Sequence, residues 1–161
     1  MGNHFSFLRS ASLILLTGLL IFTSCEKIDL FEKTVAFKSH AWATADKPSF
    51  EFIITDTSSL YNLFVVFRHT DAYGYNNLWM NLTIVPPGDT AQTQLKEFKL
   101  ADNNKGWLGS GMDDIFEHRI KVNDNPIRYK AGTYNFVLQQ MMREDPLLDV
   151  LNAGIRLEKV K

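Results

Sequence analysis

The feature that most constrains the fold of this chain is an alternation of apolar and polar residues with a period of two. In the segment NLWMNLTIV, residues 77–85, every second residue is apolar, namely Leu78, Met80, Leu82 and Ile84. Successive side chains of a strand point to opposite faces, so this segment is predicted to form a strand with one dry side. The run Pro-Pro-Gly-Asp at 86–89 then ends the strand, because proline and glycine mark turns.

Other segments repeat this alternation. Residues 60–69 are apolar on both faces, which predicts a central strand covered on both sides, and residues 131–141 place Tyr134, Phe136 and Leu138 on one face. Weaker strands are predicted at 34–42, 50–55, 95–100, 115–122 and 153–160. Short strands separated by Gly, Pro, Asn and Asp turns predict an all-β fold, an antiparallel two-sheet β-sandwich of jelly-roll type.

One segment departs from the strand pattern. The stretch EDPLLDVLN, residues 144–152, is predicted to form one or two helical turns with Pro146 at the first helical position. The fold is therefore expected to contain at most a short helix near the C-terminus.

The first 24 residues are unlike the rest of the chain. After the positive charge at Arg9, the run from Ala11 to Phe22 carries no charge, and two small polar residues then precede Cys25. A positive region, a short apolar run and a small-residue cleavage site predict a secretory signal peptide over residues 1–24. The alternative is a short transmembrane anchor, which is disfavoured because a spanning helix needs roughly 20 apolar residues.

Cys25, the only cysteine of the chain, follows the apolar run directly. This arrangement resembles the bacterial lipobox, so Cys25 is predicted to carry the lipid that attaches the protein to a membrane. The N-terminal MGNHFS also fits the myristoylation pattern, but that motif does not predict the apolar run behind it. Residues 25–33 are charged and are predicted to form a lipidated tether, followed by a β-sandwich domain at 34–161.

Composition and motifs exclude several functions. Without Arg9, 16 of the 17 Lys and Arg residues oppose 18 Asp and Glu, a near-neutral balance that argues against a nucleic-acid binder. A lone cysteine cannot form an intramolecular disulfide, so the domain must be held together by its core. The sequence has no Gly-rich phosphate loop, nucleophile elbow or HExxH motif. No enzymatic activity, catalytic residue or cofactor is predicted.

No metal site is predicted either. His40, His69 and His118 are scattered along the chain and lack the spacing of metal ligands. Asp102 opens a stretch with some likeness to a calcium-binding loop. The EF-hand register requires glycine at its sixth position, however, where this chain has Trp107. A turn between strands is the better interpretation of that stretch.

Five residues near two loops form a candidate interaction face. The segment AYGYNNLW contains Tyr73, Tyr75, Asn77 and Trp79, and GWLGSG places Trp107 in a loop framed by glycines. Exposed aromatic residues on a β-sandwich can stack on sugar rings or anchor a protein interface. The alternative is that these aromatic residues are buried, where they cover a sheet or plug one end of the sandwich.

These features together resemble the GldH family of gliding-motility lipoproteins of the Bacteroidota. Besides the lipobox, the resemblance is carried by FRHTDAYGYNNLW, by GWLGSGMDD and by the closing stretch GTYNFVLQQMMREDPLLDVLNAGIRLEK. It implies a non-catalytic lipoprotein of the cell envelope, held by lipid on Cys25 at the outer membrane and required for gliding. Its implied partners are other gliding proteins and the type 9 secretion machinery.

Two further expectations accompany this resemblance. The triplet Asp89 to Ala91 resembles the short O-glycosylation motif of these bacteria, with Thr90 as the acceptor. The alternative function is a carbohydrate-binding or polysaccharide-handling surface lipoprotein, because jelly rolls often bind sugars. That alternative predicts an exposed row of Trp79, Tyr73 and Trp107 along one face of the sandwich.

Overall fold

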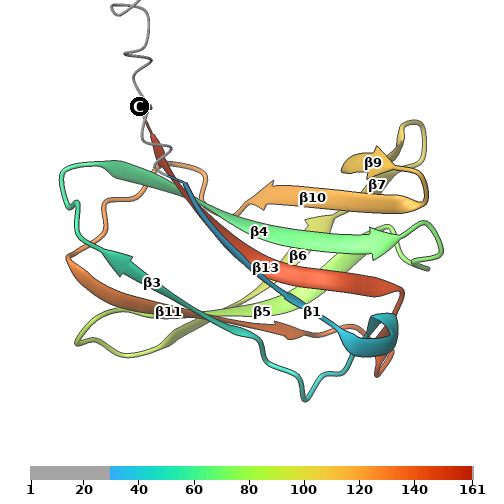
Figure 1. The fold of residues 1–161 in the computed structure, drawn as a ribbon, viewed down its shortest axis with the longest axis horizontal. Coiled ribbons are helices and arrows are strands. Elements are labelled where there is room, and N and C mark those ends of the chain that lie inside the picture. The colour runs from blue at the N-terminus through green and yellow to red at the C-terminus, as the bar shows by residue number, and fades with distance from the viewer. Residues whose placement is uncertain (1–29, 161) are drawn as a thin grey trace, which may run out of the picture.

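The computed structural model describes residues 30–160, which form a sandwich of two antiparallel sheets (Figure 1). The five-stranded sheet contains, in spatial order, β1 (Leu30–Ala36), β13 (Val150–Val160), β4 (Leu60–Thr70), β10 (Ile115–Lys121) and β9 (Ser110–Met112). The four-stranded sheet contains β3 (Ser49–Ile54), β11 (Gly132–Gln140), β5 (Asn77–Val85) and β6 (Gln92–Lys99). The short elements are η2 (Lys38–His40), β2 (Ala41–Trp42), β7 (Ala101–Asp102), β8 (Gly106–Trp107) and β12 (Leu147–Leu148).

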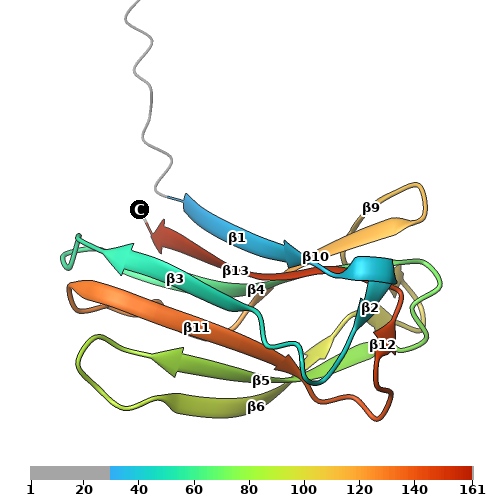
Figure 2. The same cartoon turned by 60° about the horizontal axis from the view of Figure 1, so that its bottom comes forward.

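The order of the eight long strands confirms the predicted jelly roll. Numbered along the chain, these strands run 1-8-3-6 in the larger sheet and 2-7-4-5 in the smaller one. Consecutive long strands therefore often lie in opposite sheets, as the two Greek keys of a jelly roll require. Figure 2 shows the two layers, with β1 above β3 and with β6 at the margin of the lower layer.

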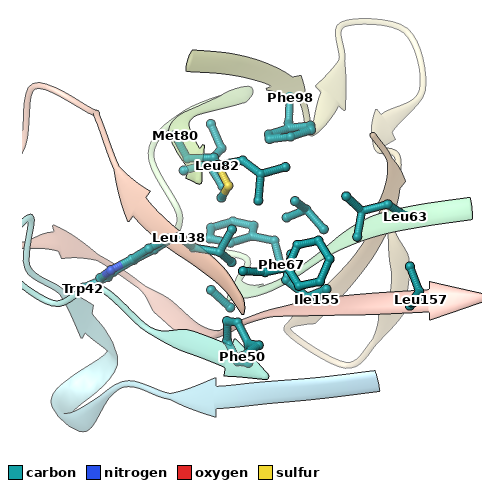
Figure 3. Packing of buried hydrophobic residues seen from close by; sticks show 14 of the residues in the cluster. Trp42, Phe50, Leu63, Phe67, Met80, Leu82, Phe98, Leu138, Ile155 and Leu157 are labelled. Atoms are coloured by element: carbon teal, nitrogen blue, oxygen red, sulfur yellow. The ribbon is translucent and has the colours of Figure 1, made fainter. Parts of the chain in front are cut away.

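The core lies between the two layers, and the period-two alternation builds it. The predicted apolar faces of β5 and β11 point inward, where Leu78, Met80, Leu82, Phe136 and Leu138 are all buried. Figure 3 shows Met80, Leu82 and Leu138 within this core. The larger sheet contributes buried side chains to the same cluster: Leu63, Phe67, Ile155 and Leu157. Burial of each such side chain stabilises the fold by about 1.5–3 kcal/mol.

β4 is apolar on both faces, and both faces are covered. On the outer face, Val66 is buried and Phe64 is half-buried beneath Arg156, whose guanidinium lies 5.9 Å from the ring centroid. Glu32 accepts hydrogen bonds from Arg119 at 3.0 Å and from Arg156 at 3.2 Å. The aliphatic stems of these arginines shield the outer face while their charges stay paired near water.

The predicted helical turns at 144–152 are wrong. This stretch contains β12 and the start of β13, and Leu147 pairs with Trp42 of β2. Leu147 and Val150 are both fully buried, so each completes the core from an extended backbone. Tertiary burial and pairing with β2 therefore override the local helical pattern.

The N-terminal strand differs in its bounds from the predicted strand at 34–42. β1 begins at Leu30, so residues 30–33, assigned to the tether by sequence, pair with β13. The strand ends at Ala36, and the chain turns through η2 before β2. Cys25 and the predicted signal peptide lie outside the described residues. Within residues 30–160, no helix has the length and apolar character needed to cross a bilayer.

Candidate functional site

The structure divides the five residues of the predicted interaction face into two groups. Tyr75 and Trp79 are exposed, at 36% and 37% of their surface, and Asn77 lies between them. Tyr73 retains only 3% of its exposed surface, and Trp107 is partly buried against the core cluster. The outward residues lie on a groove, whereas the inward residues help to close one end of the sandwich.

The outer groove is a hollow of about 360 Å³ on the outside of the four-stranded sheet. It is lined by Tyr75, Asn77, Trp79, Met141, Met142 and Arg143. Trp79 points outward because Leu78 and Met80, its neighbours on β5, point into the core. The end of β11 continues beside it, and the backbone N–H of Met141 donates to the Trp79 carbonyl at 2.8 Å. The groove therefore combines two aromatic rings, two thioethers and one cation.

Polar contacts fix the walls of the outer groove. The Asn77 amide donates to the Glu97 carboxylate at 2.6 Å, and the Tyr75 hydroxyl donates to Glu144 at 3.3 Å. Partial burial and the adjacent Glu144 carboxylate raise the pKa of Tyr75 above its usual value. The short bond to Glu97 holds the Asn77 side chain in place, whereas the longer bond to Glu144 holds Tyr75 more weakly.

A buried glutamine holds the loop that forms the other wall. Gln140 is fully buried, and its amide nitrogen donates to Thr44 Oγ1 at 2.8 Å and to the Glu144 carbonyl at 3.2 Å. Its side-chain oxygen accepts the backbone N–H of Met142 at 2.8 Å. Because a buried amide without partners is costly, these bonds favour one conformation of the loop. The outer groove is therefore pre-formed.

Tyr73 and Trp107 belong to an inner cluster with His69, His118 and Phe116. The Tyr73 ring lies 4.9 Å from the His69 ring and 6.3 Å from the Trp107 ring, measured between centroids. The Trp107 indole N–H donates to the carboxylate of Asp71 at 2.7 Å. The Tyr73 hydroxyl donates to a backbone carbonyl at 3.1 Å. These rings plug the end of the sandwich near the β7–β8 hairpin.

His69 and His118 face one another inside this inner cluster, although they are distant in sequence. Antiparallel pairing of β4 with β10 places both on the inner face, where their Nε2 atoms lie 3.0 Å apart. Both rings are buried, at 0% and 3% exposure. Gly109 passes so close that a Cβ atom there would lie 2.9 Å from the His118 ring. The spacing of these histidines in the sequence does not indicate their pairing, which arises from the register between β4 and β10.

The histidine pair is electrically neutral at physiological pH. Burial lowers the pKa of His69, while the Thr70 carbonyl and the carboxylates of Asp71 and Asp149 oppose that effect. Burial and the neighbouring His69 lower the pKa of His118 to about 4. The Thr70 carbonyl, 2.7 Å from His69 Nδ1, can only accept, so the neutral His69 ring carries its proton on Nδ1 and its Nε2 accepts from His118 Nε2. Among residues 30–160, no group of three metal-ligating side chains gathers here or elsewhere.

The remaining predicted site residues lie apart from both groups. Thr90 is exposed in the turn between β5 and β6, where its backbone N–H donates to the Asp89 carboxylate at 2.7 Å. Asp102 accepts the backbone N–H of Asn104 at 3.0 Å and forms an ion pair with Lys99 at 2.6 Å. These contacts describe a turn, in agreement with the interpretation of this stretch from sequence.

Comparison with known proteins gives one family. The sequence model of the GldH lipoprotein family matches residues 29–157. The gliding motility lipoprotein GldH of Flavobacterium johnsoniae is 26% identical over 159 residues, which cover 94% of this chain and 98% of that protein. A homologue of GldH from Christiangramia forsetii is 26% identical over 153 residues, which cover 91% of this chain and 93% of that protein.

Solved structures show a weaker likeness. The VP2 subviral particle of infectious bursal disease virus matches 81% of this chain and 32% of its own chain, with 15% identity and a TM-score of 0.36. The Gx strain of the same virus matches with 13% identity and a TM-score of 0.33. Structural similarity this low does not indicate a function.

Proposed function

Because the chain belongs to the GldH lipoprotein family, we propose that it is a lipid-anchored, non-catalytic envelope protein that supports the gliding and type 9 secretion machinery. Its two curated relatives are named as gliding motility lipoproteins. Lipid on Cys25 holds the domain at the outer membrane, and the sandwich contacts other envelope proteins. The observation that carries this proposal is the outer groove, a pre-formed surface that leaves Tyr75 and Trp79 exposed.

The chemistry of the outer groove suits a protein partner. Interfaces concentrate binding energy in Trp, Tyr and Arg residues that are surrounded by near-neutral contacts. Trp79, Tyr75 and Arg143 supply those three types, and methionines pack adaptably against varied apolar surfaces. Since Gln140 already fixes one wall, little conformational entropy is lost when a partner docks.

The carbohydrate-binding alternative depends on a row of exposed aromatic rings. Such a row would require Tyr73 and Trp107 to stand beside Trp79 on one face. In the structure Tyr73 is buried and the Trp107 indole is bonded to Asp71. Protein contacts are therefore the function that the groove supports best. A glycan-binding assay tests the carbohydrate alternative.

The test replaces the gene with a variant carrying Tyr75→Ala and Trp79→Ala. We expect the cells to lose gliding while they retain normal amounts of membrane-bound protein. Ile53→Ala is the matched control, because Ile53 is a large exposed apolar residue on the outer face of the same sheet, outside the groove. Normal gliding in the double variant would overturn the role of the groove. Binding of the wild-type protein to a glycan array that disappears in the variant would favour the carbohydrate alternative.

The anchor is tested separately with Cys25→Ser. We expect this variant to lose incorporation of labelled fatty acid, to leave the membrane fraction and to reproduce the loss of gliding. The double groove variant should keep the lipid label, so the two defects can be told apart. A Cys25→Ser protein that still localises to the membrane and supports gliding would contradict the anchor.

A further inference from the structure

The strand β6 is one of the two edges of the four-stranded sheet, and β3 is the other. β6 pairs with β5 along its length, from Gln92 to Lys99, and the described residues provide no strand on its other side (Figure 2). Such an edge presents a row of unpaired backbone N–H and C=O groups. An edge of eight residues is roughly 27 Å long at the usual rise of a strand.

The chain itself begins a strand beside this edge and then leaves it. Just beyond β6, the backbone N–H of Leu108 donates to the Leu100 carbonyl at 2.8 Å, so the chain that returns from the β7–β8 hairpin passes beside the end of β6. The chain then crosses to the other sheet, where β9 pairs with the start of β10. The larger sheet thus has five strands and the smaller only four, with β6 at one edge of the smaller sheet and β3 at the other.

Two hollows lie in line along the seam between β6 and β10. The first, of about 430 Å³, lies between Lys99, the Leu108–Ser110 turn and residues 117–121 of β10. The second, of about 230 Å³, lies beside Gln94 and Lys96, and core residues Leu63 and Leu82 contribute to its lining. Edge side chains that face inward should be covered by the opposite sheet. Gln94 faces inward beside Leu82 and is nevertheless exposed.

The opposite seam of the sandwich is bridged. There Lys33 of β1 reaches across to β3, where its ammonium donates to the Glu51 carbonyl and lies 5.2 Å from the centroid of the Phe52 ring. Lys96 holds the comparable inward position on β6, directly opposite the buried Met80. Within residues 30–160 its ammonium forms no hydrogen bond or ion pair, although the Asp124 carboxylate lines the same hollow.

We propose that the β6 edge accepts an extended segment of a partner protein as a fifth strand, with an acidic side chain of that segment paired to Lys96. Main-chain hydrogen bonds to β6 provide the affinity, as in other cases of β-strand addition, and the hollow beside Leu63, Leu82 and Ile84 receives an apolar side chain of the segment. A second copy of this chain is a poor occupant. Antiparallel pairing of two β6 strands would bring together edges that each carry two lysines and one glutamate.

The test selects binders from a display library of random octapeptides against the full-length lipoprotein in detergent. We expect the enriched peptides to alternate apolar residues and to contain Asp or Glu. Bound peptide should slow the amide hydrogen exchange of residues 92–99. The Lys96→Glu variant should weaken binding at least tenfold and Lys96→Gln less. Lys47→Glu should have no effect, because Lys47 is exposed away from the seam.

Several results would overturn this inference. Among them are a library that yields no enriched peptide, protection that appears away from β6, and equal binding by Lys96→Glu when its thermal midpoint is unchanged. Self-association of the purified protein that Lys96→Glu alters would assign the edge to a second copy instead. The outer groove lies on the far side of β5 and β11, so its double variant should leave peptide binding intact.

Discussion

Tyr73 and Tyr75 are separated by a single glycine, yet Tyr73 packs in the inner cluster and Tyr75 lines the outer groove. Tyr73 is enclosed by aromatic rings and donates its hydroxyl to a backbone carbonyl. Tyr75 instead reaches toward Glu144 at the surface. Trp107 and Trp79 divide in the same way, one bonded to Asp71 and the other left exposed. Residue type therefore does not decide which aromatic residues of this protein stabilise it and which are available to a partner.

The difference lies in how completely each ring is satisfied within the fold. An aromatic side chain that is buried with its polar atom hydrogen-bonded contributes to stability but has no accessible surface for binding a ligand. One that is half-exposed on a rigid wall contributes less to stability and retains surface that a partner can bury. The two regions should therefore respond in opposite ways to mutation, in stability for one and in gliding for the other.

The largest effect is expected for Tyr73→Ala. Removing this ring leaves a cavity beside Phe67, His69 and Trp107, so the free energy of unfolding should fall by about 3–5 kcal/mol. Denaturant titration of the purified protein measures this loss. Tyr73→Phe is the control, since it removes only the hydrogen bond to the Asn77 carbonyl and should cost about 1 kcal/mol. A loss below 1 kcal/mol for Tyr73→Ala would break the distinction between the two regions.

Acid should weaken the inner cluster through its histidines. The pKa values of His69 and His118 in the folded protein are lowered from 6.5. Between pH 6.5 and about 4, these histidines therefore bind more protons in the unfolded chain than in the folded protein. Stability therefore falls as the pH falls through this window, by at most about 3 kcal/mol for His118. Above pH 6.5 both states carry neutral histidines, and the effect is absent.

The measurement is free energy of unfolding as a function of pH from 7.5 down to about 4.5. The histidines dominate most of this range, because the hydrogen bond from Arg119 holds the pKa of Glu32 below 4.5, so its stabilisation begins to fall only near the lower end of the range. His118→Gln should flatten the profile. A wild-type profile that is already flat would show that the pair does not resist protonation.

A smaller effect on stability, together with an effect on function, is expected for Gln140→Ala. The substitution leaves the Met142 N–H and the Glu144 carbonyl without the partner that fixes the loop, and should cost about 2 kcal/mol. The outer groove should lose its pre-formed wall, so gliding should decline at normal protein levels. Amide hydrogen exchange at residues 141–144 should accelerate selectively. Unchanged exchange there would show that Gln140 stabilises the core without shaping the groove.

Much of the fold follows from local pattern, whereas the division between the two regions does not. Alternation along β5 and β11 fixes which side chains face inward, because it needs only the geometry of a single strand. The pairing of His69 with His118 depends on the register between β4 and β10, which joins residues far apart in sequence. The fate of Tyr73 depends on packing against Trp107, a residue of another loop.

The mistaken helix at residues 144–152 has a similar cause. Its local signals were consistent, with Pro146 placed where a helix could begin. What decides its conformation is β2, more than 100 residues earlier, which pairs with Leu147 and Leu148. A short segment forms few contacts of its own, so a distant partner that buries Leu147 completely outweighs local propensity.

The smallest effect on stability is expected for Trp79→Ala, which tests the comparison from the other side. The Trp79 ring is 37% exposed, and the core contacts of this strand come from its buried neighbours Leu78 and Met80. The free energy of unfolding should therefore fall by about 1 kcal/mol or less. Gliding should nevertheless be lost, the reverse of what Tyr73→Phe should show. If Trp79→Ala instead destabilised the protein as strongly as Tyr73→Ala, the outer groove would be part of the core, and the partner would have to be sought on another surface.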